Sequence, residues 1–298
     1  MRILVTGVTG QVGSALATKL ATVGTVVPAD RSVLDLTRPE DIASRLDEIA
    51  PDIIVNPAAY TAVDRAEDER DLAFLVNADA PRALARWSAA RKIALLHFST
   101  DYVYSGRGSA PWKESDETGP LSVYGASKLA GENAIREVGG PHIIARTSWV
   151  YAPTGSNFLR TIVRLARERE ELRIVADQIG APTSADIIAD TLASFFASPG
   201  GLSSVIDRTD GLVHVAAAGS TSWHGFATSI VEGLRMRGVP LKVERVVAIG
   251  TADFPTRAQR PANSRLDLSK LSQVLGRSPP DWSAGLATVL DDLAASGL

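Results

Sequence analysis

Cysteine is absent from this chain of 298 residues. Its absence excludes disulfides, thiolate nucleophiles and zinc sites built on cysteine. Long apolar runs are also missing, because the segments at 52–59 and 93–98 are far too short to cross a bilayer. Residues 1–6 have neither the basic start nor the cleavage site of a signal peptide. We therefore expect a cytoplasmic protein that makes no membrane contact.

An excess of charge of one sign is missing as well. The formal net charge is −3, and both signs are spread along the chain. No continuous positive field is therefore present to hold a phosphate backbone, and nucleic acid is not expected as a partner. The four histidines, His97, His142, His214 and His224, lack metal-ligand spacing, so we expect structural roles for them.

Apolar runs alternate with amphipathic segments in the first half of the chain. Strands are predicted at 3–6, 25–29, 53–56, 93–99 and 143–146. Helices are predicted at 11–22, 39–50, 72–91 and 122–138. This alternation predicts a parallel sheet, and strands that are apolar throughout indicate that helices cover both of its faces. The fold class is therefore α/β, with a Rossmann-type doubly wound parallel sheet.

The second half is less regular and predicts a smaller C-terminal α/β substrate-binding domain. Helices are predicted at 157–170, 185–197, 223–237 and 282–295, and 198–211 is predicted as an exposed turn region. We expect a dinucleotide-binding domain over 1–148 and a substrate-binding domain over 149–298. Segments near 172–198 and 212–217 are candidates to return to the first domain.

Glycines recur where the first strand meets the first helix. Gly7, Gly10 and Gly13 surround Gln11 and Val12 in a turn that is typical of dinucleotide-binding proteins. Bare backbone lets a pyrophosphate approach closely, and the N-terminus of the following helix offers unpaired N–H groups to the anion. The context of strand and helix favours a phosphate site over an ordinary turn.

Residues after the second predicted strand bear on the choice of cofactor. Asp30 can accept hydrogen bonds from a ribose hydroxyl, which favours NADH, whereas Arg31 can bind a 2′-phosphate, which favours NADPH. A solvated surface charge is the alternative for Arg31. Asp35 and Leu36 either border the adenine or form a helix-entry turn. The choice between NADPH and NADH stays open, with a slight lean to NADPH.

A tyrosine and a lysine stand four residues apart in a predicted helix. This spacing places Tyr124 and Lys128 on one helical face, where the cation is expected to lower the phenol pKa from about 10. Tyr124 would then protonate a ketone while hydride arrives from a nicotinamide. Thr100, at the end of an apolar strand, either bonds the same carbonyl or caps the strand end.

Several longer segments carry a family resemblance. STDYVY at 99–104, YGASKLAGE at 124–132, RTSWVY at 146–151, DQIGAPT at 177–183 and RPANSRL at 260–266 resemble the extended short-chain dehydrogenases and, among them, the dTDP-4-dehydrorhamnose reductase family. The resemblance implies a catalytic set of Thr100, Tyr124 and Lys128. It also implies reduction of the C4 ketone of dTDP-4-dehydro-L-rhamnose to dTDP-L-rhamnose, the last step of dTDP-rhamnose synthesis for cell-wall polysaccharide.

The same resemblance implies the remaining contacts. Beside the cofactor we expect Ala58, Ala59 and Tyr60. Around the dTDP-linked 4-keto-6-deoxy sugar we expect Thr61, Val63, Thr100, Asp101, Tyr102, Trp149, Asn157 and Arg260. A flat indole suits a sugar pocket, although an ordinary core position is the alternative for Trp149. Arginine suits a diphosphate because its donors form a fork.

One position departs from the family pattern. The resemblance implies that some family members form a dimer bridged by magnesium, and that one of the acidic magnesium ligands is a glutamate where this chain has Ala15. Only Asp186 and Asp190 remain near the positions of the other acidic ligands. We therefore predict no required metal, and a monomer or weak homodimer. Two rival functions stay open: a nucleotide-sugar epimerase, in which hydride returns to its substrate, and a regulatory subunit similar to that of methionine adenosyltransferase.

Overall fold

Six parallel strands form the central sheet of the computed structural model, which describes residues 1–297. The strands lie in the order β2–β1–β3–β4–β5–β10, and every pairing between neighbours is parallel. They span β1 (Arg2–Thr6), β2 (Thr25–Ala29), β3 (Ile53–Asn56), β4 (Ala94–Thr100), β5 (His142–Thr147) and β10 (Leu212–His214). The chain reverses direction across the sheet between β1 and β3, which is the switch point where such folds bind ligands.

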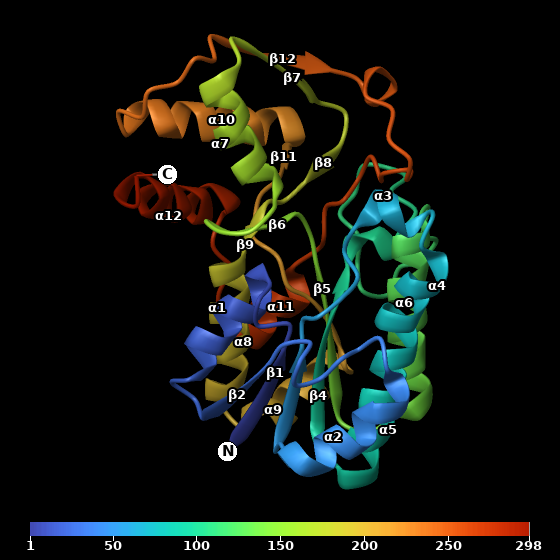
Figure 1. The fold of residues 1–298 in the computed structure, drawn as a ribbon. Coiled ribbons are helices and arrows are strands. Elements are labelled where there is room, and N and C mark those ends of the chain that lie inside the picture. Colours follow the sequence, from blue (N-terminus) through green and yellow to red (C-terminus); the bar gives the residue numbers. More distant parts are fainter. Residues whose placement is uncertain (298) are drawn as a thin grey trace.

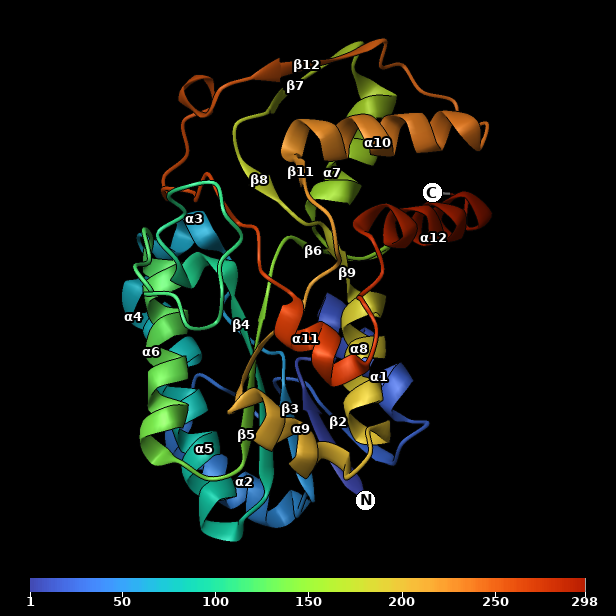
Figure 2. The same ribbon diagram turned by 180° about the vertical axis from the view of Figure 1, so that it is seen from behind.

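Helices cover both faces of this sheet (Figures 1 and 2). One face packs on α1 (Gln11–Leu20), α8 (Ala185–Ala197), α9 (Gly201–Thr209) and α11 (Ser269–Leu275). The other packs on α2 (Ile42–Ile49), preceded by η1 (Pro39–Asp41), and on α5 (Ala80–Arg91) and α6 (Val123–Val138). Ile3 and Val5 enter the first core and Leu4 the second, as strand alternation requires. The predicted doubly wound α/β fold is confirmed.

The predicted helix at 72–91 is divided. It consists of α4 (Arg70–Phe74), a π-helical turn η2 (Leu75–Asp79) and α5, and it follows the short helix α3 (Val63–Ala66). Asn77 lies in the π-helical turn and bonds the backbone of Tyr60 twice: Oδ1 accepts from its N–H at 2.8 Å, and Nδ2 donates to its carbonyl at 3.0 Å. This wider helical turn places the Asn77 side chain where it fixes the backbone of the 58–62 loop through both bonds.

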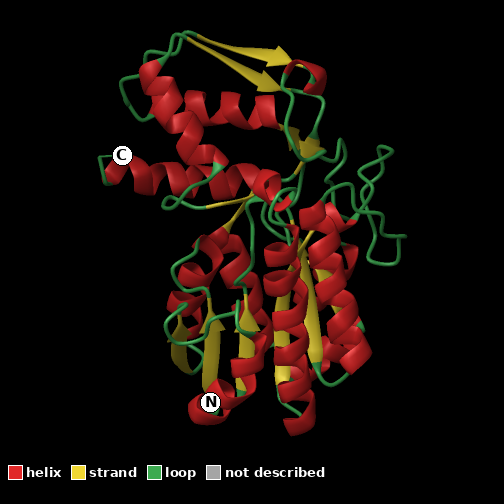
Figure 3. Cartoon of the chain, turned by 45° about the vertical axis from the view of Figure 1, so that its right-hand side comes forward, coloured by secondary structure: helices red, strands yellow, loops and turns green. Residues whose placement is uncertain are grey.

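A second core lies beyond the carboxyl ends of the sheet (Figure 3). It is built from α7 (Phe158–Glu168), α10 (Trp223–Met236) and α12 (Trp282–Ala295), together with the parallel pair β7 (Glu171–Val175) and β12 (Arg245–Ile249). Short pairs connect the two regions: β6 (Val150–Tyr151) with β9 (Thr183–Ser184), and β8 (Ile179–Gly180) with β11 (Thr221–Ser222). The 3-10 turns η3 (Asp101–Val103) and η4 (Thr251–Asp253) complete the elements of residues 1–297.

The chain returns to the central sheet through α8, α9, β10 and α11, while β7 pairs in the second region. The domain limits at 148 and 149 stay a prediction. The predicted turn region at 198–211 is wrong, because 201–209 form α9, whose Val205 and Thr209 are buried. Within residues 1–297, every helix is too short or too polar to span a membrane.

Candidate active site

A cleft of about 710 Å³ opens at the carboxyl ends of β1, β3, β4 and β5. Its size is typical of small-molecule sites. The cleft collects residues from both regions of the chain, and most of the predicted site residues line it. These are Gly7, Gly10, Gln11, Val12, Gly13, Asp30, Arg31, Asp35, Leu36, Ala58, Ala59, Thr61, Val63, Thr100, Asp101, Tyr102, Tyr124, Lys128, Trp149 and Asn157.

Two predicted residues lie outside this lining. The Tyr60 phenol donates to Glu69 Oε2 at 2.5 Å. The Arg260 guanidinium bonds both carboxylate oxygens of Asp64, at 3.1 and 2.7 Å. Arg260 thus joins the segment after η4 to α3, and both Tyr60 and Arg260 already have a protein partner.

The glycine loop follows β1 and leads into α1. Gly7 has φ +57°, a conformation that favours glycine, and a Cβ there would lie 2.9 Å from Ala58 Cβ. A Cβ on Gly13 would lie 2.1 Å from the Gly7 carbonyl oxygen, so only glycine allows α1 to start so close to the loop. Gly10 caps α1 without a side-chain bond, which leaves backbone N–H groups free for an anion.

Asp30 and Arg31 lie at the end of β2. Asp30 Oδ1 accepts from Ser32 N at 2.8 Å, from Ser32 Oγ at 2.6 Å and from Val33 N at 3.2 Å. The Ser32 hydrogen bonds lower the pKa of Asp30, so its carboxylate is ionised and already serves the turn. Arg31 is 80% exposed and lies 3.9 Å from Asp35 Oδ1, which leaves its donors available to a ligand.

Thr100, Tyr124 and Lys128 meet deep in the cleft. Thr100 ends β4, whereas Tyr124 and Lys128 lie one turn apart in α6, whose N-cap Ser122 accepts from Gly125 N at 3.2 Å. Burial raises the pKa of Tyr124 to about 12. This direction is opposite to the expected lowering, because burial outweighs the hydrogen bond with Thr100, which by itself would lower the pKa of Tyr124. The phenol is therefore protonated near neutral pH, as a proton donor must be.

Lys128 is almost fully buried. Its Nζ donates to the Phe98 carbonyl at 2.6 Å and lies 3.3 Å from His97 Nε2. Burial lowers the pKa of Lys128 to about 8, which brings its titration close to neutral pH. A small change in its surroundings can therefore change its charge.

Asp101 is a buried carboxyl beside this group. Thr100 Oγ1 donates to its Oδ1 at 3.0 Å, whereas Oδ2 has no hydrogen-bond partner among residues 1–297. Burial raises the pKa of Asp101 to about 6. The Asp101 carboxyl therefore stays protonated to a higher pH than a solvated aspartate does. Its ionisation places a negative charge in a buried site away from water.

Asp101→Asn is expected to flatten the pH dependence of stability. A raised carboxyl pKa contributes stability that is present below about pH 4 and is lost as the pH rises through about 6. Between pH 4 and 7, the free energy of unfolding of the wild type should fall by up to about 3 kcal/mol relative to that of the variant. Urea unfolding at several pH values measures this difference. Parallel curves for the two proteins would show that Asp101 ionises without cost.

An indole pair forms one wall of the cleft. Trp149, at φ +49°, stacks on Trp223 with ring centroids 3.5 Å apart and planes 6° apart. A Cβ on Gly180 would lie 2.5 Å from Trp149 Cε2, so glycine gives the indole its space. The sequence pattern does not identify Trp223 as a site residue, because it lies 74 positions after Trp149 and starts α10, where nothing in the local pattern points to a site.

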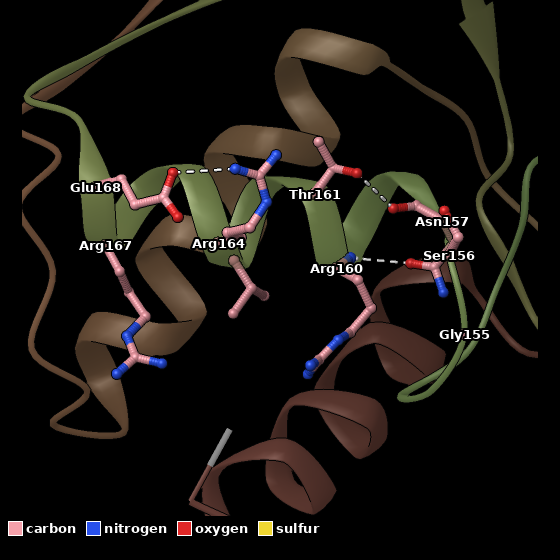
Figure 4. Close-up of a pocket in the computed structure, with 9 residues that line it drawn as sticks. Gly155, Ser156, Asn157, Arg160, Thr161, Arg164, Arg167 and Glu168 are labelled. Carbon is pink, nitrogen blue, oxygen red and sulfur yellow. Dashed lines mark hydrogen bonds and ion pairs between the residues drawn. The ribbon is translucent and has the colours of Figure 1, made fainter.

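A second concavity, of about 660 Å³, follows α7 and shares Gly155, Ser156 and Asn157 with the cleft (Figure 4). Asn157 Oδ1 accepts from Arg160 N at 2.9 Å and so caps α7. Arg164 pairs with Glu168 at 3.0 Å, and both side chains are more than half exposed. Such exposed pairs contribute little energy.

The fold and the cleft match a known family. Residues 1–295 match the family model described as the RmlD substrate binding domain. The chain belongs to this family. The dTDP-4-dehydrorhamnose reductase of Burkholderia thailandensis is 47% identical over 297 residues, covering 98% of this chain and 99% of the relative. That of Escherichia coli K12 is 44% identical over 301 residues, covering 98% of each chain.

Solved structures of this family agree with the fold. A dTDP-4-dehydrorhamnose reductase from Clostridium acetobutylicum has a TM-score of 0.88 at 34% identity and covers 98% of this chain and 99% of its own. One from Bacillus anthracis, in complex with NADP, has a TM-score of 0.87 at 35% identity with the same coverage. The family resemblance predicted from the sequence motifs is confirmed.

Proposed function

We propose that this family member reduces the C4 ketone of dTDP-4-dehydro-L-rhamnose to dTDP-L-rhamnose with NADPH or NADH, as the last step of dTDP-rhamnose synthesis. The observation that carries the proposal is the meeting of Thr100, Tyr124 and Lys128 in one cleft with the glycine loop. The names of relatives that are 47% and 44% identical over the full chain support the same substrate.

The residues of the cleft suit this chemistry. A bound nicotinamide dinucleotide supplies the hydride. Its pyrophosphate is expected on Gly7, Gly10 and the N-terminus of α1. Tyr124 holds a proton that it can donate to the ketone oxygen, and Thr100 lies in place to orient the same oxygen. The stacked indoles of Trp149 and Trp223 offer a flat apolar wall to the sugar.

The proposed reaction requires no metal. Ala15 adds no carboxylate near α8, and Lys19 forms an ion pair with Asp190, which occupies one of the two remaining acidic positions. Burial and the neighbouring Asp190 raise the pKa of Asp186. These residues fit a metal-bridged dimer poorly. We accordingly propose a monomer or weak homodimer.

The deciding experiment follows the absorbance of NADPH, and then of NADH, in the presence of purified protein and dTDP-4-dehydro-L-rhamnose. Stoichiometric oxidation with dTDP-L-rhamnose identified by NMR supports the reductase. An epimerase would change the sugar without net oxidation, because the hydride returns to its substrate. A folded protein that oxidises neither cofactor and leaves the sugar unchanged would favour the regulatory subunit.

Arg31→Ala is expected to reduce the preference for NADPH. Arg31 lines the cleft with its guanidinium exposed, where it can bind a 2′-phosphate that NADH lacks. Loss of a hydrogen-bonded charge pair of this kind should raise the KM for NADPH about tenfold and should change the KM for NADH little. Arg38→Ala is the matched control, because Arg38 pairs with Asp41 at 2.8 Å outside the cleft lining. Equal changes for both cofactors would contradict the assignment.

A further inference from the structure

A buried chain of polar side chains extends from the first strand of the sheet to Lys128. Thr6 Oγ1 donates to Asn56 Oδ1 at 2.6 Å, Asn56 Nδ2 lies 3.0 Å from His97 Nδ1, and His97 Nε2 lies 3.3 Å from Lys128 Nζ. Each of the four residues is at most 2% exposed. They come from β1, β3, β4 and α6, so four separate elements meet in this chain.

Thr6, the first residue of this series of side chains, determines the orientation of the Asn56 amide. Thr6 Oγ1 accepts from Ala58 N at 3.3 Å, and its proton goes to Asn56 Oδ1. The amide nitrogen of Asn56 therefore faces His97. An amide nitrogen only donates, so His97 Nδ1 must accept. Burial holds the pKa of His97 well below its usual range, and the ring is neutral. The single ring proton consequently lies on Nε2.

This tautomer acts directly on Lys128. The Nε2–H group points toward Nζ, while Nζ donates to the Phe98 carbonyl at 2.6 Å. A neutral amine accepts from Nε2–H through its lone pair. An ammonium group has no lone pair, so it would place N–H against N–H. Such a contact leaves buried donors unsatisfied, which disfavours the charged form.

We propose that the tautomer of His97, set by Thr6 and Asn56, controls the charge of Lys128. His97 and Asn56 are then positioning residues rather than catalytic ones. Charging of Lys128 requires the ring proton to move to Nδ1 and the Asn56 amide to turn. The three side chains therefore switch together. The consequence for turnover depends on the proposed function, whereas the tautomer and the lysine charge do not.

Other charged groups near Lys128 leave this control intact. Glu132 lies one turn further along α6 and favours the charged lysine. Its carboxylate is already bonded by Arg146 of β5, at 2.8 and 2.6 Å. On the cleft side lie Tyr124, which stays protonated at neutral pH, and Asp101, which ionises with a pKa of about 6 and is already charged at neutral pH. His97 is therefore the neighbour whose ring proton can move between Nδ1 and Nε2 at neutral pH while the ring stays uncharged.

The test reads the tautomer by ¹⁵N NMR of histidine-labelled protein without substrate, with His97→Gln assigning one of four histidine signals. Wild-type His97 should carry its proton on Nε2. In Asn56→Asp, the carboxylate accepts from Nδ1–H, so the proton should move to Nδ1. Lys128 should then titrate about one pH unit higher, because Nε2 accepts from the ammonium and a negative charge lies nearby.

Thr6→Val is the uncharged matched variant. It removes the hydroxyl that orients Asn56 but keeps the branched shape, so a mixture of both tautomers is expected. In Asn56→Asp, the basic limb of kcat against pH should move upward together with the lysine titration. A wild-type proton on Nδ1, an unshifted Lys128 in Asn56→Asp, or an unchanged tautomer in Thr6→Val would each overturn the proposal. If Asn56→Asp fails to fold, the Lys128 titration is compared between wild type and Thr6→Val instead, and an unchanged titration despite a mixture of tautomers would overturn the proposal. Neither the tautomer nor the lysine titration needs reductase activity.

Discussion

Tyr124→Phe is expected to lower kcat by about 10²- to 10⁴-fold, which is the effect of removing a general acid. The dissociation constant for the dinucleotide should stay within a factor of about two to three. The phenylalanine keeps the ring, which packs edge-on against Tyr102 with centroids 5.6 Å apart. The hydroxyl that we propose as the proton donor is lost. Steady-state kinetics with NADPH, together with a fluorescence titration of the cofactor, measures both quantities.

Tyr151→Phe provides the matched control for the loss of a phenol. Tyr151 is also buried, but it packs in the second core against Phe226, and its hydroxyl has no hydrogen-bond partner among residues 1–297. This variant should retain wild-type turnover. If Tyr124→Phe behaved like Tyr151→Phe, another group would have to protonate the ketone, and the role given to Tyr124 would be withdrawn.

Arg146→Met lowers the free energy of unfolding by about 3–5 kcal/mol. Arg146 is 1% exposed and bonds both oxygens of Glu132, and its Nη1 donates to the Tyr104 hydroxyl at 2.6 Å. Methionine fills much of the volume but leaves the buried Glu132 carboxylate with only the longer bond from Arg136, at 3.4 Å, which costs far more than the lost contacts. Denaturation by urea measures the change.

Two further variants separate charge burial from packing. Arg164→Met breaks the exposed pair with Glu168 and should cost less than about 1 kcal/mol. The double variant Arg146→Met/Glu132→Leu removes the stranded charge and should regain a large part of the loss. A loss for Arg146→Met as small as that for Arg164→Met would mean that the Glu132 carboxylate finds water or takes up a proton at no cost.

Local patterns predicted the strands of the sheet well. The five predicted strands match β1 to β5 within one residue at each end, because strands buried on both faces are apolar throughout. The glycine loop was equally readable, since its spacing and its place between strand and helix are local. Helix α9 was missed because the turn-forming residues around 198–211 masked the apolar positions that pack on the sheet.

The sequence by itself determined the doubly wound fold, the glycine loop between β1 and α1 and the placement of Tyr124 and Lys128 one turn apart in α6, because each depends on residues within one turn or one strand and its neighbours. Only the tertiary structure decided that Trp223 stacks on Trp149, that burial raises rather than lowers the pKa of Tyr124, and that Asn56 contacts both Thr6 and His97. The physical reason is that burial and hydrogen-bond direction depend on atoms brought together from distant segments, which no local spacing encodes.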